Sequence, residues 1–298
     1  MPVAPFDYLV PESLEEACRM LEERGGEAKV LAGGQSLIPL MKLNLVQVSC
    51  LVDLKRIPGL AFIRAENDPA SGGKEVLRVG ALTTHADLAR SEAARTKVPL
   101  LADTARGIGH PLVRNRGTIG GSLSHCDPSA DLCATSLALD ATMVIARADG
   151  TRRRVGAEGF FKGLFEADLK RGDVLEEVRF PVTPSGTGYD FRKLTLGHGD
   201  FPLLSVSAVL HVGPDGCSDA RIVVGGISEV PVRMREAEGL LIGRRLLPED
   251  VEGAAASASR ASNPSSDSEV SGAYKKKMVG VLVRRALGKA TERAGRER

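Results

Sequence analysis

Two short glycine-rich stretches constrain this chain more than any other feature of its sequence. The first runs Leu31-Ala32-Gly33-Gly34-Gln35-Ser36-Leu37, and the second runs Thr118-Ile119-Gly120-Gly121-Ser122. Glycine lets the backbone approach a ligand closely, and consecutive N–H groups in such a turn form a concave anion site. One such turn is common. Two of them, each joining apolar segments, predict a phosphate-rich ligand held between two lobes.

The composition is that of an ordinary globular chain, long enough for two domains. It has 298 residues, with 43% hydrophobic residues, 26% charged residues and a net charge of +2. Basic residues gather near the C-terminus, but the absence of Trp and the presence of only three Tyr leave little surface for stacking bases. We therefore interpret the basic run as a solvated helix face and a frayed tail, and we expect no nucleic-acid partner.

The five cysteines form no Cys-x-x-Cys pair, so the sequence spells out neither an iron–sulfur site nor a zinc site. Their odd number and irregular spacing favour reduced thiols in a cytoplasmic protein. Cys18 falls on the apolar face of a helix and is expected in the core. No signal peptide and no apolar stretch long enough to span a membrane are visible.

Apolar spacing predicts an α+β chain whose first part divides into two α/β lobes. Lobe one, about residues 1–57, has a helix that starts at the Ser13–Glu16 capping box and a helix at 37–43 with Ser36 as its cap. Its strands are expected at 29–31 and 49–54. Lobe two, about residues 58–180, is expected to contain strands at 76–82, 142–146, 151–155 and 174–180, and helices at 84–94, 97–107 and 129–139.

Turn-forming residues crowd the segment 181–188, which predicts a domain boundary. Beyond it the pattern indicates three strands and then three helices: 189–196, 203–211, 220–224, 232–243, 248–260 and 268–288. Strands followed by helices are typical of a separate α+β domain. We place this domain at 187–290 and a tail at 291–298.

Several familiar catalytic and cofactor motifs are absent from the sequence. It contains no G-x-G-x-x-G after a strand, no P-loop, no H-E-x-x-H and no G-x-S-x-G. We therefore expect no catalytic residue and no metal ligand in this chain.

The paired glycine motifs, in this order, are similar to the two FAD motifs of the molybdenum hydroxylase (xanthine oxidase) family. The chain more narrowly resembles the flavin subunit, or medium subunit, of carbon monoxide dehydrogenase and related bacterial enzymes. The resemblance covers nearly the whole chain. It includes four further stretches: Phe6-Asp7-Tyr8, Leu51-Val52-Asp53-Leu54, Asp127-Pro128-Ser129-Ala130-Asp131-Leu132 and Phe191-Arg192-Lys193-Leu194.

The resemblance implies a two-lobed FAD-binding domain of the vanillyl-alcohol-oxidase (PCMH) type, followed by a domain with a three-stranded antiparallel sheet and helices. FAD would be bound non-covalently, with its pyrophosphate against backbone N–H groups of both glycine turns. By the same resemblance Asp131 contacts the polar middle of FAD and Leu175 lies near its adenine or ring system. Lys193 would lie close to the isoalloxazine, and Phe201 against the flavin ring.

Each of these assignments has a plainer alternative. Asp131 could cap the helix that starts near Ser129, Lys193 could be an exposed strand lysine, and Phe201 could belong to the core. His125 and Cys126 could suggest a covalently bound flavin, which the resembled subfamily does not have. His198 is the sole candidate where relatives often carry a basic residue after the equivalent of Lys193, so we expect the charge near the flavin ring to differ from that in relatives.

The implied function is that of a flavoprotein subunit in a heterotrimeric molybdenum hydroxylase. It would relay electrons from the [2Fe-2S] clusters of a small subunit through FAD to an external acceptor. The molybdenum cofactor would lie on a large subunit, and the complex would be a dimer of heterotrimers. The substrate could be carbon monoxide, an aldehyde, a purine or another N-heterocycle. Two alternatives stay open: a self-sufficient flavin reductase of the same fold acting on an enolpyruvyl sugar nucleotide, and a scaffold that has lost its cofactor.

Overall fold

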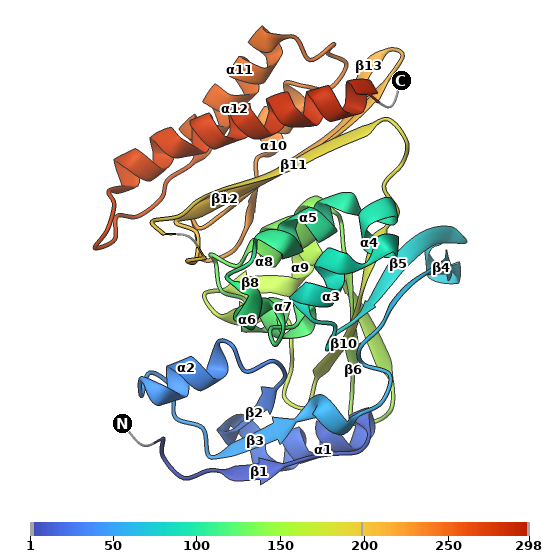
Figure 1. Cartoon of the computed structure of the whole chain (residues 1–298), viewed down its shortest axis with the longest axis vertical. Coiled ribbons are helices and arrows are strands. Elements are labelled where there is room, and N and C mark those ends of the chain that lie inside the picture. The colour runs from blue at the N-terminus through green and yellow to red at the C-terminus, as the bar shows by residue number, and fades with distance from the viewer. Residues whose placement is uncertain (1–2, 198, 297–298) are drawn as a thin grey trace.

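Three tiers stack along the longest axis of the molecule (Figure 1). The computed structural model describes residues 3–197 and 199–296. Lobe one, drawn in blue, forms one end, lobe two forms the middle, and the C-terminal domain, in yellow to red, forms the other end. The expected α+β organisation, with two lobes followed by a C-terminal domain, is confirmed.

Lobe one is a small parallel sheet with the strand order β1-β3-β2. Its helices and strands are β1 Asp7–Leu9, α1 Leu14–Arg24, η1 Gly25–Glu27, β2 Ala28–Leu31, α2 Leu37–Lys42, β3 Cys50–Asp53 and η2 Leu54–Arg56. Only one of the two hydrogen bonds of the predicted Ser13–Glu16 capping box is present. Ser13 Oγ accepts the N–H of Glu16 at 3.2 Å, but the Glu16 carboxylate accepts from Glu12 instead of Ser13. Ser36 occupies the cap position of α2, as expected, but its side chain makes no capping hydrogen bond.

Lobe two is built on an antiparallel sheet with the order β4-β5-β10-β6-β7. Its strands are β4 Ile63–Asp68, β5 Lys74–Gly80, β6 Thr142–Ala146, β7 Arg152–Gly156, β8 Phe161–Gly163, β9 Glu166–Ala167 and β10 Val174–Pro181. Its helices are η3 Pro69–Ser71, α3 His85–Arg90, α4 Glu92–Lys97, α5 Pro99–Gly107, α6 Pro111–Arg114, α7 Ile119–His125, α8 Asp131–Ala138 and α9 Ala157–Phe160. The expected helix 84–94 is two helices, because Ser91 is extended and caps α4 by accepting the N–H of Ala94.

The C-terminal domain contains the expected three-stranded meander and adds a short fourth strand at its edge. Its elements are β11 Thr187–Leu194, β12 Leu204–Gly213, β13 Gly216–Gly225, β14 Val232–Arg233, α10 Arg235–Gly239, α11 Pro248–Ala261 and α12 Gly272–Arg296. The helix expected at 232–243 is reduced to α10, since β14 occupies its first residues. Helix α12 continues to Arg296, so most of the expected tail is helical.

Strand β12 explains how the C-terminal domain is attached, because successive side chains of a strand point to opposite faces. Leu204, Val206, Ala208 and Leu210 pack with helices α11 and α12 in one core. Val209, on the other face, belongs to the core of lobe two. A buried chain of hydroxyl groups also crosses this boundary, from Thr104 to Thr135 at 3.0 Å and from Thr135 to Ser207 at 2.9 Å.

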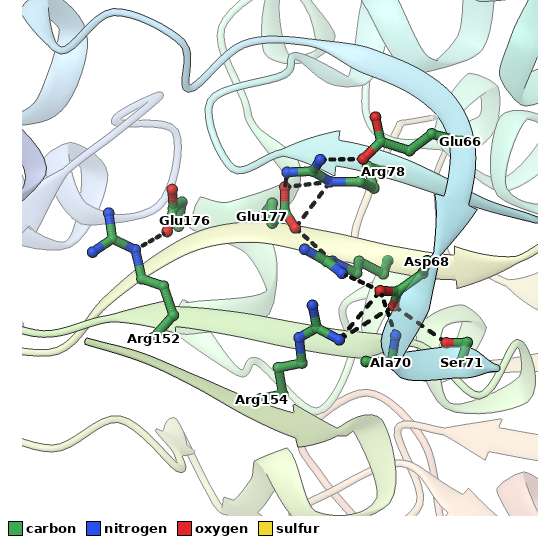
Figure 2. A network of polar contacts seen from close by, with 10 residues as sticks. Glu66, Asp68, Ala70, Ser71, Arg78, Arg152, Arg154, Glu176 and Glu177 are labelled. Atoms are coloured by element: carbon green, nitrogen blue, oxygen red, sulfur yellow. Dashed lines mark hydrogen bonds and ion pairs between the residues drawn. The ribbon is translucent and has the colours of Figure 1, made fainter. Parts of the chain in front are cut away.

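The face of the lobe-two sheet that points away from the helices of lobe two carries a network of charged side chains (Figure 2). Glu177 on β10 lies at its centre, with a side chain only 3% exposed. It accepts hydrogen bonds from Arg78 on β5 at 2.9 Å and from Arg179 at 2.6 Å. Arg179 continues to Asp68, which also binds Arg154 on β7, so the network joins the two edges of the sheet.

We expect Glu177→Gln to lower the free energy of unfolding by about 2 kcal/mol, because Arg78 and Arg179 would keep their charges while losing the carboxylate between them. The adjacent Glu176→Gln is the matched control. Glu176 pairs with Arg152 at a more exposed site, where such a pair contributes up to about 1 kcal/mol. Chemical denaturation of both variants measures the difference, and equal losses would contradict the central position of Glu177.

Candidate functional site

The two glycine turns, which belong to different lobes, lie against each other. A Cβ atom built on Gly33 would lie 2.1 Å from the carbonyl oxygen of Arg116, which is closer than any side chain could approach. A Cβ atom on Gly121 would lie 3.6 Å from that of Ala32. The first turn follows β2 of lobe one, and the second leads into α7 of lobe two. The structure therefore brings both predicted motifs together at the junction of the lobes.

The first turn offers a run of backbone donors. Residues 33–37 make no hydrogen bond through their N–H groups to any acceptor in residues 3–197 and 199–296. The turn reverses at Gly34, whose φ is 69°. Leu31 ends β2, Leu37 begins α2, and only Gln35 of the turn is exposed. A run of unpaired N–H groups at partly buried positions fits an anionic ligand.

The second turn does not offer its donors in this way. The N–H groups of Ile119 and Gly120 donate to the carbonyl oxygens of Thr83 at 3.0 Å and Ala81 at 2.8 Å. Those of Gly121 and Ser122 donate to the side chain and the carbonyl oxygen of Thr118. The expectation that both turns present backbone N–H groups is therefore wrong for the second turn. Its glycines serve close packing instead, since a Cβ on Gly120 would lie 2.5 Å from that of Ala81.

Asp131 and Lys193 form an ion pair between lobe two and the C-terminal domain. Lys193 Nζ on β11 lies 2.7 Å from Asp131 Oδ2 and also donates to the carbonyl oxygen of Gly107 at 2.8 Å. The side chain of Lys193 is 19% exposed and that of Asp131 is 4% exposed. Both plainer alternatives are wrong: Lys193 is not an exposed strand lysine, and the Asp131 carboxylate binds Lys193, while Ala130 occupies the cap position of α8.

The Asp131 carboxylate has an incomplete set of partners. Oδ1 is buried and accepts no hydrogen bond from the described residues. Burial raises the pKa of Asp131 to about 6, and the charge and hydrogen bond of Lys193 oppose that increase. A buried carboxylate oxygen without a donor is costly, so this atom is a candidate contact for a bound ligand.

The side chains of Leu175 and Phe201 lie apart from the ion pair of Asp131 and Lys193. Leu175 on β10 is 4% exposed and packs in the core of lobe two. Phe201 lies between β11 and β12 and is 63% exposed, so the alternative that it belongs to the core is wrong. His198 lies outside the described residues. The loop that carries Phe201 passes close to lobe two, where a Cβ on Gly199 would lie 3.6 Å from the carbonyl carbon of Gly109.

Sequence reasoning missed His85, which lies beneath the second glycine turn. Its backbone N–H donates to Gly117 at 3.0 Å, and a Cβ on Gly117 would lie 2.8 Å from its ring. Burial, with a contribution from Arg114, lowers the pKa of His85 to about 4, so the ring is neutral at physiological pH. A single histidine in a helical pattern carries no spacing signal, and only the fold places it against Gly117.

The five cysteines are buried free thiols. Cys18 is in the core, as expected. Cys126, the candidate for covalent attachment, has a pKa of about 11 because burial disfavours its thiolate. Its neighbour His125 packs against Phe165, with ring centroids 5.0 Å apart, and burial lowers the pKa of the imidazole. The Cys126 thiol therefore lacks the thiolate form that attachment of a flavin through cysteine requires.

We expect a thiol reagent added to the native protein at about pH 8 to modify few or none of the five cysteines, because thiolates are disfavoured and the sulfur atoms are buried. The same reagent in denaturant should titrate all five. Rapid labelling of Cys126 in the native state, located by mass spectrometry, would contradict this description of its surroundings.

No group of three or more His, Cys, Asp or Glu side chains is arranged to hold a metal ion in residues 3–197 and 199–296. Among the helices described, none is both long enough and apolar enough to cross a membrane.

Comparison with known proteins places both halves of the chain in described families. Residues 4–183 match the family "FAD binding domain in molybdopterin dehydrogenase", and residues 189–290 match "CO dehydrogenase flavoprotein C-terminal domain". The chain is 37% identical to subunit alpha of the 6-hydroxypseudooxynicotine dehydrogenase complex of Paenarthrobacter nicotinovorans, over 97% of this chain and 95% of the relative. It is also 37% identical to the carbon monoxide dehydrogenase medium chain of Hydrogenophaga pseudoflava, over 97% and 98%.

Solved structures agree with these matches. Carbon monoxide dehydrogenase from Hydrogenophaga pseudoflava superposes with a TM-score of 0.93 at 37% identity, covering 98% of this chain and 99% of that chain. Quinoline 2-oxidoreductase from Pseudomonas putida 86 gives a TM-score of 0.90 at 32% identity, covering 99% of each. The chain therefore belongs to the FAD-binding flavoprotein subunits of the molybdopterin dehydrogenases, the family that its paired glycine turns predict.

Proposed function

We propose that this chain is the flavoprotein subunit of a three-part molybdenum hydroxylase, in which bound FAD takes electrons from [2Fe-2S] clusters of a small subunit and passes them to an external acceptor. The observation that carries the proposal is the contact between the two glycine turns, beside the unpaired N–H groups of residues 33–37. FAD supplies a centre that exchanges electrons singly or in pairs. The chain itself contributes binding, orientation and shielding from water.

The first turn supplies the phosphate contacts in this proposal, through the N–H groups of Gly33, Gly34 and Gln35 and their neighbours Ser36 and Leu37. The second turn, residues 118–122, acts mainly by packing. Ala32 of the first turn faces Gly121 of the second turn, and the neighbouring Ser122 is partly buried. Asp131 is the proposed acceptor for a hydroxyl or N–H group of FAD, because Oδ1 is buried without a donor in the described part of the chain.

The expected contacts of Leu175 and Phe201 with FAD are proposed in a more limited form. Leu175 can reach a ligand only through its backbone, because its side chain is packed in the core of lobe two. Phe201 is proposed as a cover for the flavin ring, which its exposure allows. We also divide the chain into an FAD-binding domain at 1–180 and a C-terminal domain at 187–290, with lobes that meet near residue 57.

The proposed partners are a large molybdopterin subunit and a small [2Fe-2S] subunit in a dimer of heterotrimers. Several relatives are named as medium chains or subunits of dehydrogenase complexes. We assign to such partners the exposed apolar side chains that follow α2 or lie on α6 and in the β8–β9 turn: Leu43, Leu45, Leu112, Leu164 and Phe165. Buried free thiols favour a cytoplasmic location.

The choice of substrate is assigned to the large subunit. Relatives that align over nearly the whole chain are named for carbon monoxide, nicotine and glyceraldehyde dehydrogenation or hydroxylation. One flavoprotein architecture thus serves complexes named for unlike substrates. This supports a chain whose own residues bind FAD and partners instead of substrate.

We expect Gly33→Ala to weaken FAD binding at least about tenfold, because the new methyl group would push the first turn away from Arg116 and misplace N–H donors, each contributing about 1.5–3 kcal/mol to an anion. Gly26→Ala in the same lobe is the control, since no atom lies within 4 Å of its added Cβ. Flavin content after gel filtration and FAD titration measure the effect. Full flavin retention in the Gly33 variant would place the cofactor elsewhere.

The electron route has its own test. Mixing the flavin-loaded chain with a chemically reduced small subunit should bleach the oxidised flavin absorbance, and omission of the small subunit should prevent this. NAD(P)H offered with an enolpyruvyl sugar nucleotide is the comparison. Rapid flavin reduction and turnover in that mixture, by the isolated chain, would favour the self-sufficient reductase over the subunit.

A further inference from the structure

The ion pair between Lys193 and Asp131 has a geometry that gives Lys193 a role in addition to any contact with the flavin. Lys193 Nζ already has two oxygen partners, Asp131 Oδ2 at 2.7 Å and the Gly107 carbonyl at 2.8 Å. Gly107 ends α5, whose last carbonyl groups carry partial negative charge. The lysine therefore lies between two negative groups of lobe two, although it belongs to β11 of the C-terminal domain.

Only one of the two carboxylate oxygens of Asp131 has a hydrogen-bond donor among the described residues. Lys193 occupies Oδ2, whereas Oδ1 is buried and receives no hydrogen bond within the described residues. Asp131 is the first residue of α8, and α8 packs against the helix of the second glycine turn, where Cys133 Sγ lies 3.9 Å from the Ser122 carbonyl oxygen. The unpaired oxygen thus belongs to the same part of lobe two as the second turn.

We propose that Lys193 is a positioning residue: from the C-terminal domain it fixes the Asp131 carboxylate through Oδ2, so that Oδ1 accepts a hydrogen bond from a hydroxyl or N–H group of FAD. This inference rests on the proposed function. It makes the C-terminal domain a participant in FAD binding through one side chain that acts on Asp131.

The charge state of Asp131 follows from the same arrangement. Burial raises its pKa to about 6, and Lys193 is the charged group that opposes the rise. The neighbouring thiols of Cys133 on α8 and Cys126 at the end of α7 are neutral, because burial raises the pKa of each. Arg221 of β13 lies at the far end of α8, where it binds the Ala138 carbonyl.

The ionisation of Asp131 sets the direction in which FAD affinity should change with pH. The ionised carboxylate is the stronger acceptor, so FAD affinity should fall as the pH drops through about 6 in the unmodified chain. Removal of the lysine charge leaves burial unopposed and raises the pKa of Asp131 further. The fall in affinity should then occur at a higher pH.

The test is a titration of the full chain, stripped of flavin, with FAD between about pH 5 and 9, followed by flavin fluorescence. We expect Lys193→Met to move the midpoint upward by at least about one pH unit and to weaken binding about tenfold at neutral pH. Lys193→Arg should restore much of the affinity, because it keeps the charge. Asp131→Asn should bind weakly and remove the transition near pH 6.

A matched control separates this effect from a general loosening of the two domains. Arg293→Met removes another contact across the same boundary, between α12 and Asp103 of α5, where the charged atoms are 3.4 Å apart. It should leave the midpoint unchanged. A Lys193→Met midpoint equal to that of the unmodified chain would overturn the inference while FAD binding stands. Failure of the unmodified chain to bind FAD at any pH would overturn the proposed function itself.

Discussion

The approach of Gly33 to the Arg116 carbonyl is the constraint on which the arrangement of the lobes depends. It is a contact between two backbones, so it admits no side chain at the point of closest approach. The first turn follows a parallel strand and the second opens a helix, so this contact joins the two lobes, together with the apolar core that α1 shares with Ala146 and Val174. The unpaired N–H groups of residues 33–37 then lie beside a second turn in which the N–H groups of residues 119–122 are already paired.

Lobe two also depends on the domain that follows it. Val209 and Val223 of the C-terminal sheet complete its core, and the hydroxyl chain through Thr104, Thr135 and Ser207 crosses the same boundary. Buried hydroxyl groups must be paired, so this chain fixes the register of β12 against α8. The pair of Lys193 and Asp131 lies on the same boundary and requires that register to form. The packing of the two domains therefore brings Lys193 of the C-terminal domain to the carboxylate of Asp131 in lobe two.

The sequence predicted the parts of the fold in which apolar residues recur with a clear period, such as α1 and β12. It missed β4, because four consecutive residues of this strand are exposed and show no apolar alternation. It predicted both glycine turns as one site, and the contact of Gly33 with Arg116 agrees. It could not tell that the donors of the second turn are consumed by Thr83 and Ala81, since those partners are set by tertiary contacts far along the chain. Proposed contacts of individual side chains with FAD remain predictions.

The shared core also affects the order in which the chain can fold during synthesis. Lobe two cannot bury one face of α8 until β12 and β13 have emerged from the ribosome, because their side chains form the other side of that core. A nascent chain that ends before residue 204 exposes this apolar face to water, together with the buried carboxylate of Asp131. The flavin-binding half is therefore expected to mature late, after the C-terminal sheet has paired, even though its own strands are synthesised first.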